Sequence, residues 1–380
     1  MRKILFVSSS RADYGLLRNL IIKIQKLNPE TYLMVTGSHL SKEFGETVSE
    51  IKKDRIKKTF IKKILDLKFK EKNIPHYVEK TIKATSQIIK KIKPDTLVIL
   101  GDRYELLGCA IAATLFRVPI AHLHGGEITS GAYDDSIRHS ISKLSHLHFP
   151  VHEKYRKRLI QLGERPKTIF NYGALGAHSI NNINFKSKLK LERDLKIKLD
   201  KKIFLITFHP TTLEKNKSKF QILNLLSALK KFNNEIKIFT TPNFDHENKI
   251  IKNAILDFIK KNKNSFFFTS IGHLNYISLM KISSLVIGNS SSGILETPSL
   301  GIPTINIGNR QKGRIISKNI INSNYEEKHI IKNIGKAILL NQKQLLKIGS
   351  PFYKKDTPKK IAMKILNFNF KLKKNFYDLK

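Results

Sequence analysis

The sequence has 380 residues, which predicts two domains at roughly 100–200 residues each. Its formal net charge is +40, with 57 Lys against 13 Arg, and the Lys residues are spread along nearly every predicted helix. A nucleic-acid-binding protein would be expected to gather basic residues in a stripe with interleaved aromatic residues, and the sequence has no such stripe. We therefore expect no nucleic-acid partner, but a basic surface that attracts an anionic small molecule.

No apolar run approaches the ~20 residues that a membrane-spanning helix needs. The N-terminal stretch MRKILFVSSS has a basic start, but its apolar run is too short for a signal peptide and predicts a first strand. The single cysteine, Cys109, excludes a disulfide framework or a cysteine metal site within one chain. These features predict a cytoplasmic protein with no membrane partner.

Short apolar strands alternate with amphipathic helices through the first half of the chain. We expect strands at 3–9, 31–37, 96–101 and 118–124, with short ones in HLHFP and TIFNYG. We expect helices at 14–27, 41–52, 76–93, 105–116 and 135–146. Strands that are apolar throughout and alternate with helices predict a parallel sheet covered on both faces.

A polar segment, 176–202, interrupts this alternation and is interpreted as a linker with a surface helix. The alternation then restarts, with strands expected at 203–208, 236–241, 265–270, at the start of 285–293, and at 304–308, and a last helix at 358–376. The predicted fold class is α/β, with two Rossmann-like doubly wound domains that face a cleft. The expected boundaries are 1–175, the linker 176–202, 203–355 and a C-terminal segment 356–380.

Unusual residues follow the predicted strands of the first half. Ligands of open parallel sheets bind beyond the carboxyl ends of the strands, so these positions indicate a site. GDRYE places Asp102 and Arg103 there, and SSSRADYG places Arg11 and Asp13 there. The alternative for both Asp13 and Asp102 is that each is an ordinary helix cap.

The second half has a comparable set of strand ends. GNSSSGILE (288–296) offers hydroxyl and backbone donors before a helix, which favours phosphate, although it lacks the Lys of a P-loop. The alternative is a capped helix without a ligand. His209, Asn243, Arg310 and Arg314 follow other strands. Because Arg bonds phosphate through a planar fork, its use at strand ends in a Lys-rich chain indicates anion binding.

Six of the 13 His residues lie within residues 120–152, together with Glu127, Asp134 and Arg138. Such a cluster is compatible with a metal site, because HLH on a strand would put His122 and His124 on one face. The segment lacks the His-Glu-x-x-His pattern, however. We therefore expect no metal and interpret the carboxylates and Arg138 as groups that act on a substrate.

Eight motifs resemble those of the hydrolysing nucleotide-sugar 2-epimerases and occur in that family's order. They are SRADYGLL, GDRYE, HLHGGE, DDSIRHSISKLSHLHF, FHPTT, PNFD, GNSSSGILE and NIGNRQKGR. The resemblance implies a GT-B-like fold of two Rossmann-like domains, a C-terminal helix that packs back towards the first domain, a homodimer and no cofactor. It implies expulsion of the nucleoside diphosphate by anti elimination across C1–C2, and water addition to the resulting glycal.

The resemblance also assigns residues. It implies a catalytic set of Asp102, Glu127, Asp134, Arg138, His209 and His124. It implies a nucleotide- or substrate-binding set of Arg11, Ala12, Asp13, Arg103, Asn243, His273, Ser290, Ser291, Ser292, Gly293, Glu296 and Arg310. One departure stands out: some members have Glu where this chain has His124, so the acid–base role there falls to His124 or Glu127.

Removal of a C2 proton that is not next to a carbonyl needs a positioned base, and the departing diphosphate needs cations. Asp102 and Asp134 are the candidate base and acid, and their mutual repulsion would separate their pKa values if they converge. The predicted substrate is UDP-N-acetylglucosamine, and the alternative is UDP- or GDP-linked N,N'-diacetylbacillosamine. Alternatives of other classes are a GT-B glycosyltransferase and a non-catalytic basic binding protein.

Overall fold

The protein is described from a computed structural model of the whole chain. The structure describes residues 1–41, 45–66, 71–214, 216–243 and 247–379. The chain forms two compact units. The first consists of Met1–Glu127, Asp134–Ser179 and Phe352–Lys380, and the second of Ile128–Tyr133 and Ile180–Pro351.

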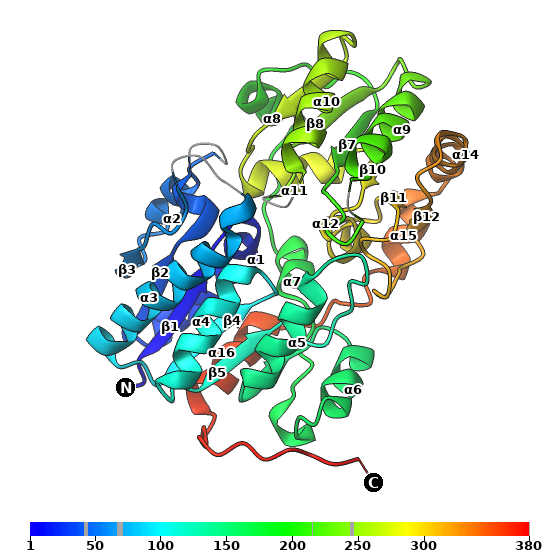
Figure 1. Cartoon of the computed structure of the whole chain (residues 1–380). Helices are drawn as coiled ribbons and strands as arrows, with labels where there is room; N and C mark the ends of the chain where they lie inside the picture. Colours follow the sequence, from blue (N-terminus) through cyan, green and yellow to red (C-terminus); the bar gives the residue numbers. More distant parts are fainter. Residues whose placement is uncertain (42–44, 67–70, 215, 244–246, 380) are drawn as a thin grey trace. The chain divides into compact units, whose positions relative to one another are not determined.

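The first unit is built on a parallel sheet (Figure 1). Its elements are β1 (Ile4–Ser8), α1 (Arg11–Leu27), β2 (Thr31–Val35), η1 (Gly37–Leu40), α2 (Val48–Lys53), β3 (Lys58–Ile61), η3 (Glu71–Asn73), α3 (Ile74–Ile92), β4 (Thr96–Leu100), α4 (Tyr104–Leu115), β5 (Ile120–Leu123), α5 (Asp134–Leu144), β6 (Leu147–Phe149), α6 (Glu153–Gln161), η4 (Pro166–Thr168), α7 (Leu175–Asn181) and α16 (Thr357–Asn367). Among the described residues, six strands lie in the order β3-β2-β1-β4-β5-β6.

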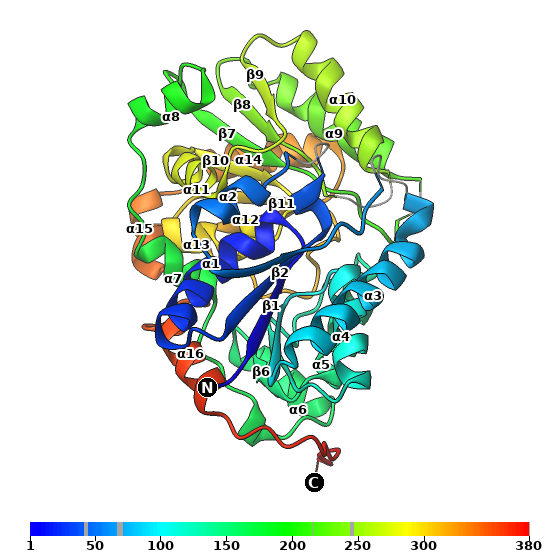
Figure 2. The ribbon, with the colours of Figure 1, turned by 90° about the vertical axis from the view of Figure 1, so that its left-hand side faces the viewer.

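Both faces of this sheet are covered, which explains why β1 and β4 are apolar and buried throughout. Alternate residues of β1 point to opposite sides: Ile4 and Phe6 pack with α1 and α16, and Leu5 and Val7 pack with α3 and α4. Figure 2 shows β1 and β2 between these two helix pairs. The C-terminal helix α16 therefore belongs to the core of the first unit.

The second unit repeats the same plan. Its elements are α8 (Lys188–Leu195), β7 (Ile203–Thr207), α9 (Ser218–Lys230), β8 (Ile236–Thr240), α10 (Asn248–Lys260), β9 (Ser265–Phe268), α11 (His273–Ile282), β10 (Leu285–Gly288), α12 (Ser292–Leu295), α13 (Thr297–Leu300), β11 (Thr304–Ile307), β12 (Ile320–Ser323), α14 (Glu327–Ile338) and α15 (Gln342–Ile348). Over the described residues, its six parallel strands are ordered β12-β11-β10-β7-β8-β9.

Each sheet reverses its strand order at one point, between β1 and β4 in the first unit and between β7 and β10 in the second. Loops that leave neighbouring strands in opposite directions open a crevice at such a switch point, which is where doubly wound folds bind ligands. Four of the strand-end motifs predicted from the sequence follow these four strands, namely SSSRADYG, GDRYE, FHPTT and GNSSSGILE. The predicted α/β class, with two doubly wound parallel sheets, is confirmed.

Several elements differ from the sequence prediction. The edge strands β3 and β12 and the helix α6 were not predicted, and TIFNYG was predicted as a strand but forms one isolated bridge, from Ile169 to His148. The last helix ends at Asn367, well before the predicted residue 376. The predicted helix at 41–52 falls partly outside the described residues, and the described part contains α2.

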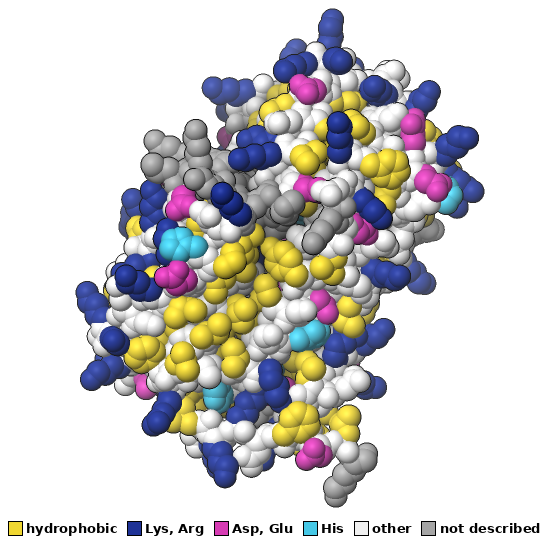
Figure 3. Space-filling model, viewed as in Figure 1, with side chains coloured by type: hydrophobic (Ala, Val, Ile, Leu, Met, Phe, Trp, Pro, Cys, Tyr) yellow, Lys and Arg dark blue, Asp and Glu magenta, His cyan; other side chains and the backbone are white. Residues whose placement is uncertain are grey.

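The basic side chains are scattered over the face that Figure 3 displays and do not gather into one stripe there. Within the described part of the chain, no helix is both long and apolar enough to cross a membrane.

Candidate active site

The loop after β1 is held by its own carboxylate. Asp13 accepts hydrogen bonds from the backbone N–H groups of Ser9 (2.9 Å) and Ser10 (2.8 Å) and forms a capping box with Ser10 at the start of α1. Asp13 is buried. Of the two sequence interpretations, the structure supports the helix cap for the Asp13 side chain, while Arg11 and Ala12 occupy the first turn of α1.

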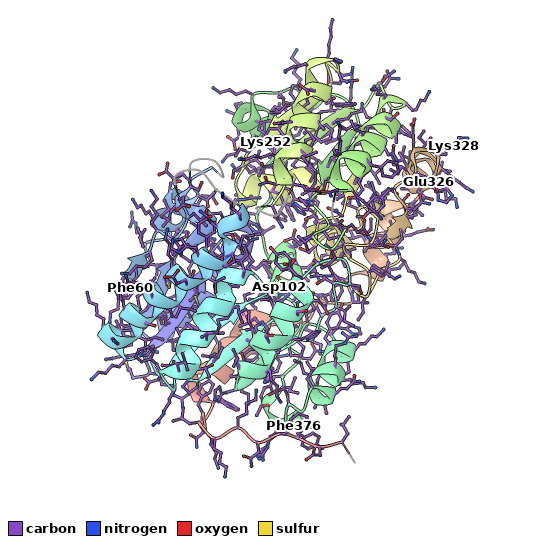
Figure 4. All side chains as sticks on the ribbon, in the orientation of Figure 1. Phe60, Asp102, Lys252, Glu326, Lys328 and Phe376 are labelled. Carbon is purple, nitrogen blue, oxygen red and sulfur yellow. The ribbon has the colours of Figure 1, made fainter. Side chains whose placement is uncertain are left out.

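The loop after β4 is shaped by a buried histidine. His122 on β5 donates from Nε2 to the carbonyl oxygen of Gly101 (2.8 Å), and its Nδ1 lies 3.0 Å from Oγ of Ser142. Burial lowers the pKa of His122 to about 3, so the ring is neutral and its Nδ1 accepts from Ser142. Gly101 has φ +89°, a conformation that glycine adopts without strain. His122 therefore fixes the backbone that presents Asp102 (Figure 4).

Asp102 lies one residue before the N-cap position of the next helix. The N-cap of α4 is Arg103, which makes no side-chain capping bond. Arg103 instead donates from Nε to Glu105 (3.2 Å), a fully buried carboxylate that the sequence analysis did not single out. Burial raises the pKa of Glu105, and the Arg103 charge opposes that shift.

Arg138 lies among three carboxylates, Asp102, Glu127 and Asp134, which we call the acidic cluster. It lies on α5, is 1% exposed, and pairs through Nη2 with Asp102. Its Nη1 donates to the backbone carbonyl of Glu127 (3.0 Å) and lies 3.4 Å from Asp135. Burial alone would lower the pKa of Arg138, but the nearby Asp102, Glu127 and Asp134 charges raise it. The buried guanidinium thus pairs with the side chain of Asp102, bonds the backbone of Glu127 and lies near the charge of Asp134.

His124 and Glu127 form a buried pair in this cluster. The strand β5 ends at Leu123, so the prediction that His122 and His124 share a strand face is wrong. His124 has φ +65°, a strained conformation for a non-glycine residue, and this redirects its ring. Its Nδ1 donates to Oε1 of Glu127 (3.1 Å), and among the described atoms its buried Nε2 has no hydrogen-bond partner. When the ring is neutral and its proton is on Nδ1, the Nε2 atom carries a lone pair that can accept a hydrogen bond.

The remaining histidines of the cluster have other partners. His148 is buried against Glu164 (3.0 Å), and His152 caps α6 by accepting from the N–H of Lys154. His139 lies 3.6 Å from Asp135, one turn away on α5. In the part of the chain that the structure describes, no three His, Cys, Asp or Glu side chains are placed to hold a metal ion.

In the second unit, His209 and Asn289 connect the loops at the switch point. The Nδ1 atom of His209 accepts from the backbone N–H of Asn243 (3.0 Å), so the neutral ring carries its proton on Nε2. Asn289 brackets the His209 backbone: its Oδ1 accepts from the N–H (2.7 Å) and its Nδ2 donates to the carbonyl (2.8 Å). The sequence analysis did not single out Asn289, although it lies inside GNSSSG.

The serine-rich loop follows directly. Gly288 has φ +136°, and a Cβ there would collide with the carbonyl oxygen of Thr207, so only glycine lets β10 approach β7. Ser290 Oγ accepts from the N–H (3.4 Å) and hydroxyl (3.1 Å) of Ser292, and Tyr276 binds the Ser292 hydroxyl (2.8 Å). Ser291 is the N-cap residue of α12, and Gly293 lies in the first turn of that helix.

The loop after β11 packs under this serine loop. Arg310 donates from Nη1 (3.3 Å) and Gln311 from Nε2 (2.8 Å) to the carbonyl oxygen of Asn289. Arg310 and Glu296 are each more than nine-tenths buried, and His273 begins α11. The second unit thus brings His209, the serine loop and Arg310 together, whereas Asp102, Glu127, Asp134 and Arg138 gather in the first.

A protein-family model matches most of the chain. The family model described as UDP-N-acetylglucosamine 2-epimerase matches residues 23–366. This range includes most of both units and the candidate site residues from Asp102 onward, but it leaves out Arg11, Ala12 and Asp13.

Two curated relatives are hydrolysing epimerases. The chain is 43% identical to the GDP/UDP-N,N'-diacetylbacillosamine 2-epimerase (hydrolyzing) of Campylobacter jejuni, over 100% of this chain and 99% of that one. It is 33% identical to the UDP-N,N'-diacetylbacillosamine 2-epimerase (hydrolyzing) of Legionella pneumophila, over 89% of each. Among solved structures, UDP-GlcNAc 2-epimerase from Neisseria meningitidis bound to UDP-GlcNAc has a TM-score of 0.79 at 19% identity, covering 96% of this chain and 99% of that one.

Proposed function

Because this chain is an enzyme of the UDP-N-acetylglucosamine 2-epimerase family, we propose that it hydrolyses nucleotide-linked N,N'-diacetylbacillosamine and releases the free 2-epimeric sugar. The proposal rests chiefly on the 43% identity to a relative of that activity over essentially the full length of both chains. From the sequence alone, UDP-N-acetylglucosamine is the predicted substrate and nucleotide-linked diacetylbacillosamine is the alternative. The relatives now favour the alternative.

The first step of the proposed reaction is an elimination. A protein base takes the proton from C2 while the C1–O bond breaks, and that bond's electron pair leaves with the nucleoside diphosphate. This forms a C1–C2 double bond. The acidic cluster suits the proton transfer, because a carboxylate and an imidazole lie beside one guanidinium. We assign the base and acid roles to the group formed by Asp102, Glu127, Asp134 and His124, with Arg138 holding them in place.

The second unit suits the departing diphosphate. His209 carries its proton on Nε2, and the serine loop supplies hydroxyl and backbone donors. In our assignment Ser290, Ser291, Ser292 and Gly293 bind the diphosphate, and Arg310 braces their loop through Asn289. We assign Glu296 to the ribose, and Asn243 and His273 to the ribose or base. We also assign Arg11, Ala12 and Arg103 to nucleotide binding, with Asp13 holding the loop that precedes α1.

The second step adds water to the double bond. A hydroxyl joins C1, and a proton is delivered to C2 on the face opposite to the one it left, which inverts that carbon. The enzyme needs one group to accept a proton and another to donate one from the opposite side. The His124–Glu127 pair and Asp102 are separate acid–base groups that meet this need.

The experiment that tests this proposal is a panel of three nucleotide sugars incubated without an acceptor. These are UDP-N-acetylglucosamine and the UDP- and GDP-linked forms of N,N'-diacetylbacillosamine. We expect free 2-epimerised sugar from a diacetylbacillosamine nucleotide, with kcat/KM at least roughly tenfold above that for UDP-N-acetylglucosamine. Preference for UDP-N-acetylglucosamine would refute the substrate, and a requirement for an acceptor would favour a glycosyltransferase.

A further inference from the structure

Six residues of the N-terminal half belong structurally to the second unit. The chain leaves the first unit after Glu127, contributes Ile128–Tyr133 to the second unit, and returns at Asp134. We call Ile128–Tyr133 the strap. Its two flanking residues are both carboxylates of the acidic cluster, so any movement of the strap acts directly on their backbone.

The strap is fastened by backbone hydrogen bonds. The Ser130 N–H donates to the carbonyl oxygen of Lys312 (3.1 Å), and the carbonyl oxygen of Gly131 accepts from the N–H of Leu213 (3.3 Å). The Tyr133 N–H donates to Oγ1 of Thr212 (3.2 Å). These bonds tie the strap to the second unit from its middle to its C-terminal end.

The partners of the strap are the loops proposed to bind the diphosphate. Lys312 lies two residues after Arg310, and Thr212 lies three residues after His209. Both loops meet at Asn289, which bonds the backbone of His209 and accepts from Arg310. The strap therefore rests on the same scaffold that holds the serine loop.

From these contacts we propose that the strap is a positioning element, which makes the placement of Glu127 and Asp134 depend on the state of the diphosphate loops. The proposal rests on the function proposed above. An anion that orders the His209, serine and Arg310 loops also orders the strap, and the strap sets the backbone at Glu127 and Asp134. The acid–base groups are then aligned only when a nucleotide is bound. Gly131 and Thr212 are the positioning residues.

Gly131 offers the sharpest test, because the strap there lies directly on backbone. A Cβ at Gly131 would lie 2.9 Å from Cα of Arg310 and 2.9 Å from the carbonyl oxygen of Asn309, and neither atom can rotate away. Gly131→Ala must therefore lift the strap from this loop. Gly335→Ala is the matched control, because a Cβ at this position on α14 has no described atom within 4 Å apart from its chain neighbours and its own helix backbone.

We expect Gly131→Ala to lower kcat by roughly tenfold to a hundredfold, the effect of misplaced catalytic groups. Dissociation constants for UDP and GDP, measured by calorimetry, should stay within roughly threefold of wild type, about 0.7 kcal/mol. In wild type, UDP should slow amide hydrogen exchange in peptides spanning residues 127–135. This protection should be lost in Gly131→Ala and kept in Gly335→Ala.

Thr212 provides a second pair of variants should Gly131→Ala fail to fold. Thr212→Val removes the acceptor for the Tyr133 N–H, whereas Thr212→Ser keeps it. We expect Thr212→Val to lower kcat and to remove the exchange protection. We expect Thr212→Ser to keep both the wild-type kcat and the protection. The inference would be overturned if kcat were unchanged in both Gly131→Ala and Thr212→Val. It would also be overturned if these variants lost UDP affinity by the same factor as kcat. Absence of wild-type turnover would instead refute the proposed function.

Discussion

At the scale of single residues, the acidic cluster depends on Arg138. The resemblance to the epimerase family groups Asp102, Glu127, Asp134 and Arg138 in one catalytic set. It did not predict that one buried guanidinium bonds both the side chain of Asp102 and the backbone of Glu127. That arrangement depends on contacts between residues 36 positions apart, which no local pattern encodes.

Asp102→Asn should lower kcat by roughly a hundredfold or more, the scale of general acid–base catalysis. The amide keeps the size of the side chain and a hydrogen-bonding oxygen for Arg138, but it cannot accept a proton from C2. Turnover of the preferred nucleotide sugar and the melting temperature should be measured together. Near-normal turnover would remove Asp102 from the mechanism.

Glu127→Gln should lower kcat by roughly tenfold to a hundredfold, because an amide cannot accept or release a proton during the reaction. The amide oxygen can still accept from Nδ1 of His124, so the variant keeps the geometry of the pair. Turnover of the preferred nucleotide sugar and the melting temperature should be measured together. An unchanged kcat would contradict an acid–base role for Glu127.

His122 should make the stability of the protein depend on pH. Its folded pKa of about 3 lies below the ordinary 6.5, so the unfolded chain binds an extra proton between these values. The stabilisation is complete above about pH 6.5 and is lost as the pH falls towards 3. His122→Gln should reduce the slope of the free energy of unfolding against pH, below pH 6, by about 1.4 kcal/mol per pH unit. Urea unfolding at several pH values measures it, and equal slopes would count against a neutral buried His122.

At the scale of elements, the strands at the centre of each sheet were predictable and those at the edges were not. The central strands β4 and β7 are apolar at nearly every position, because helices cover both faces. The edge strand β3, with sequence KTFI, is only partly buried and carries no such signal. The last helix was predicted too long because its apolar pattern continues into FNFKL, where the chain is no longer helical.

The C-terminal tail after α16 has a structural role that sequence periodicity missed. The ammonium group of Lys374 donates to the carbonyl oxygens of Lys143 (2.5 Å) and Ser145 (2.5 Å) at the end of α5, and it pairs with Glu164 (2.7 Å). The ammonium group provides hydrogen-bond donors for carbonyl oxygens at the end of the helix, and its positive charge interacts favourably with the helix dipole. Phe376, labelled in Figure 4, lies against Gly163. The tail thus secures the helix that bears Asp134 and Arg138.

Lys374→Met should lower the free energy of unfolding by about 2 kcal/mol, since buried carbonyls lose their donor and Glu164 loses a cation. The methionine keeps most of the aliphatic stem. Lys373→Met is the matched control, because Lys373 is exposed on the same tail. Chemical denaturation of the two variants measures the difference, and equal stabilities would show that the tail does not secure α5.

At the scale of the whole molecule, the order of eight motifs predicted the fold class and the family correctly. Motif order survives sequence divergence because each motif follows a strand, and strand order fixes which loops meet at a switch point. The sequence did not predict that residues 128–133 belong to the second unit. Their place there depends on backbone hydrogen bonds to Lys312 and Leu213 rather than on side-chain type. Substrate choice also depends on contacts with sugar substituents that single motifs do not specify.

The central claim is that the chain inverts C2 through elimination and water addition. It is tested most directly by running the reaction in D₂O with the preferred nucleotide sugar and examining C2 of the free product by proton NMR. The account predicts one deuterium at C2 of the product, because the original proton leaves to a protein base and its replacement comes from solvent. A 2-epimerised product that retains the substrate hydrogen at C2 would contradict the account.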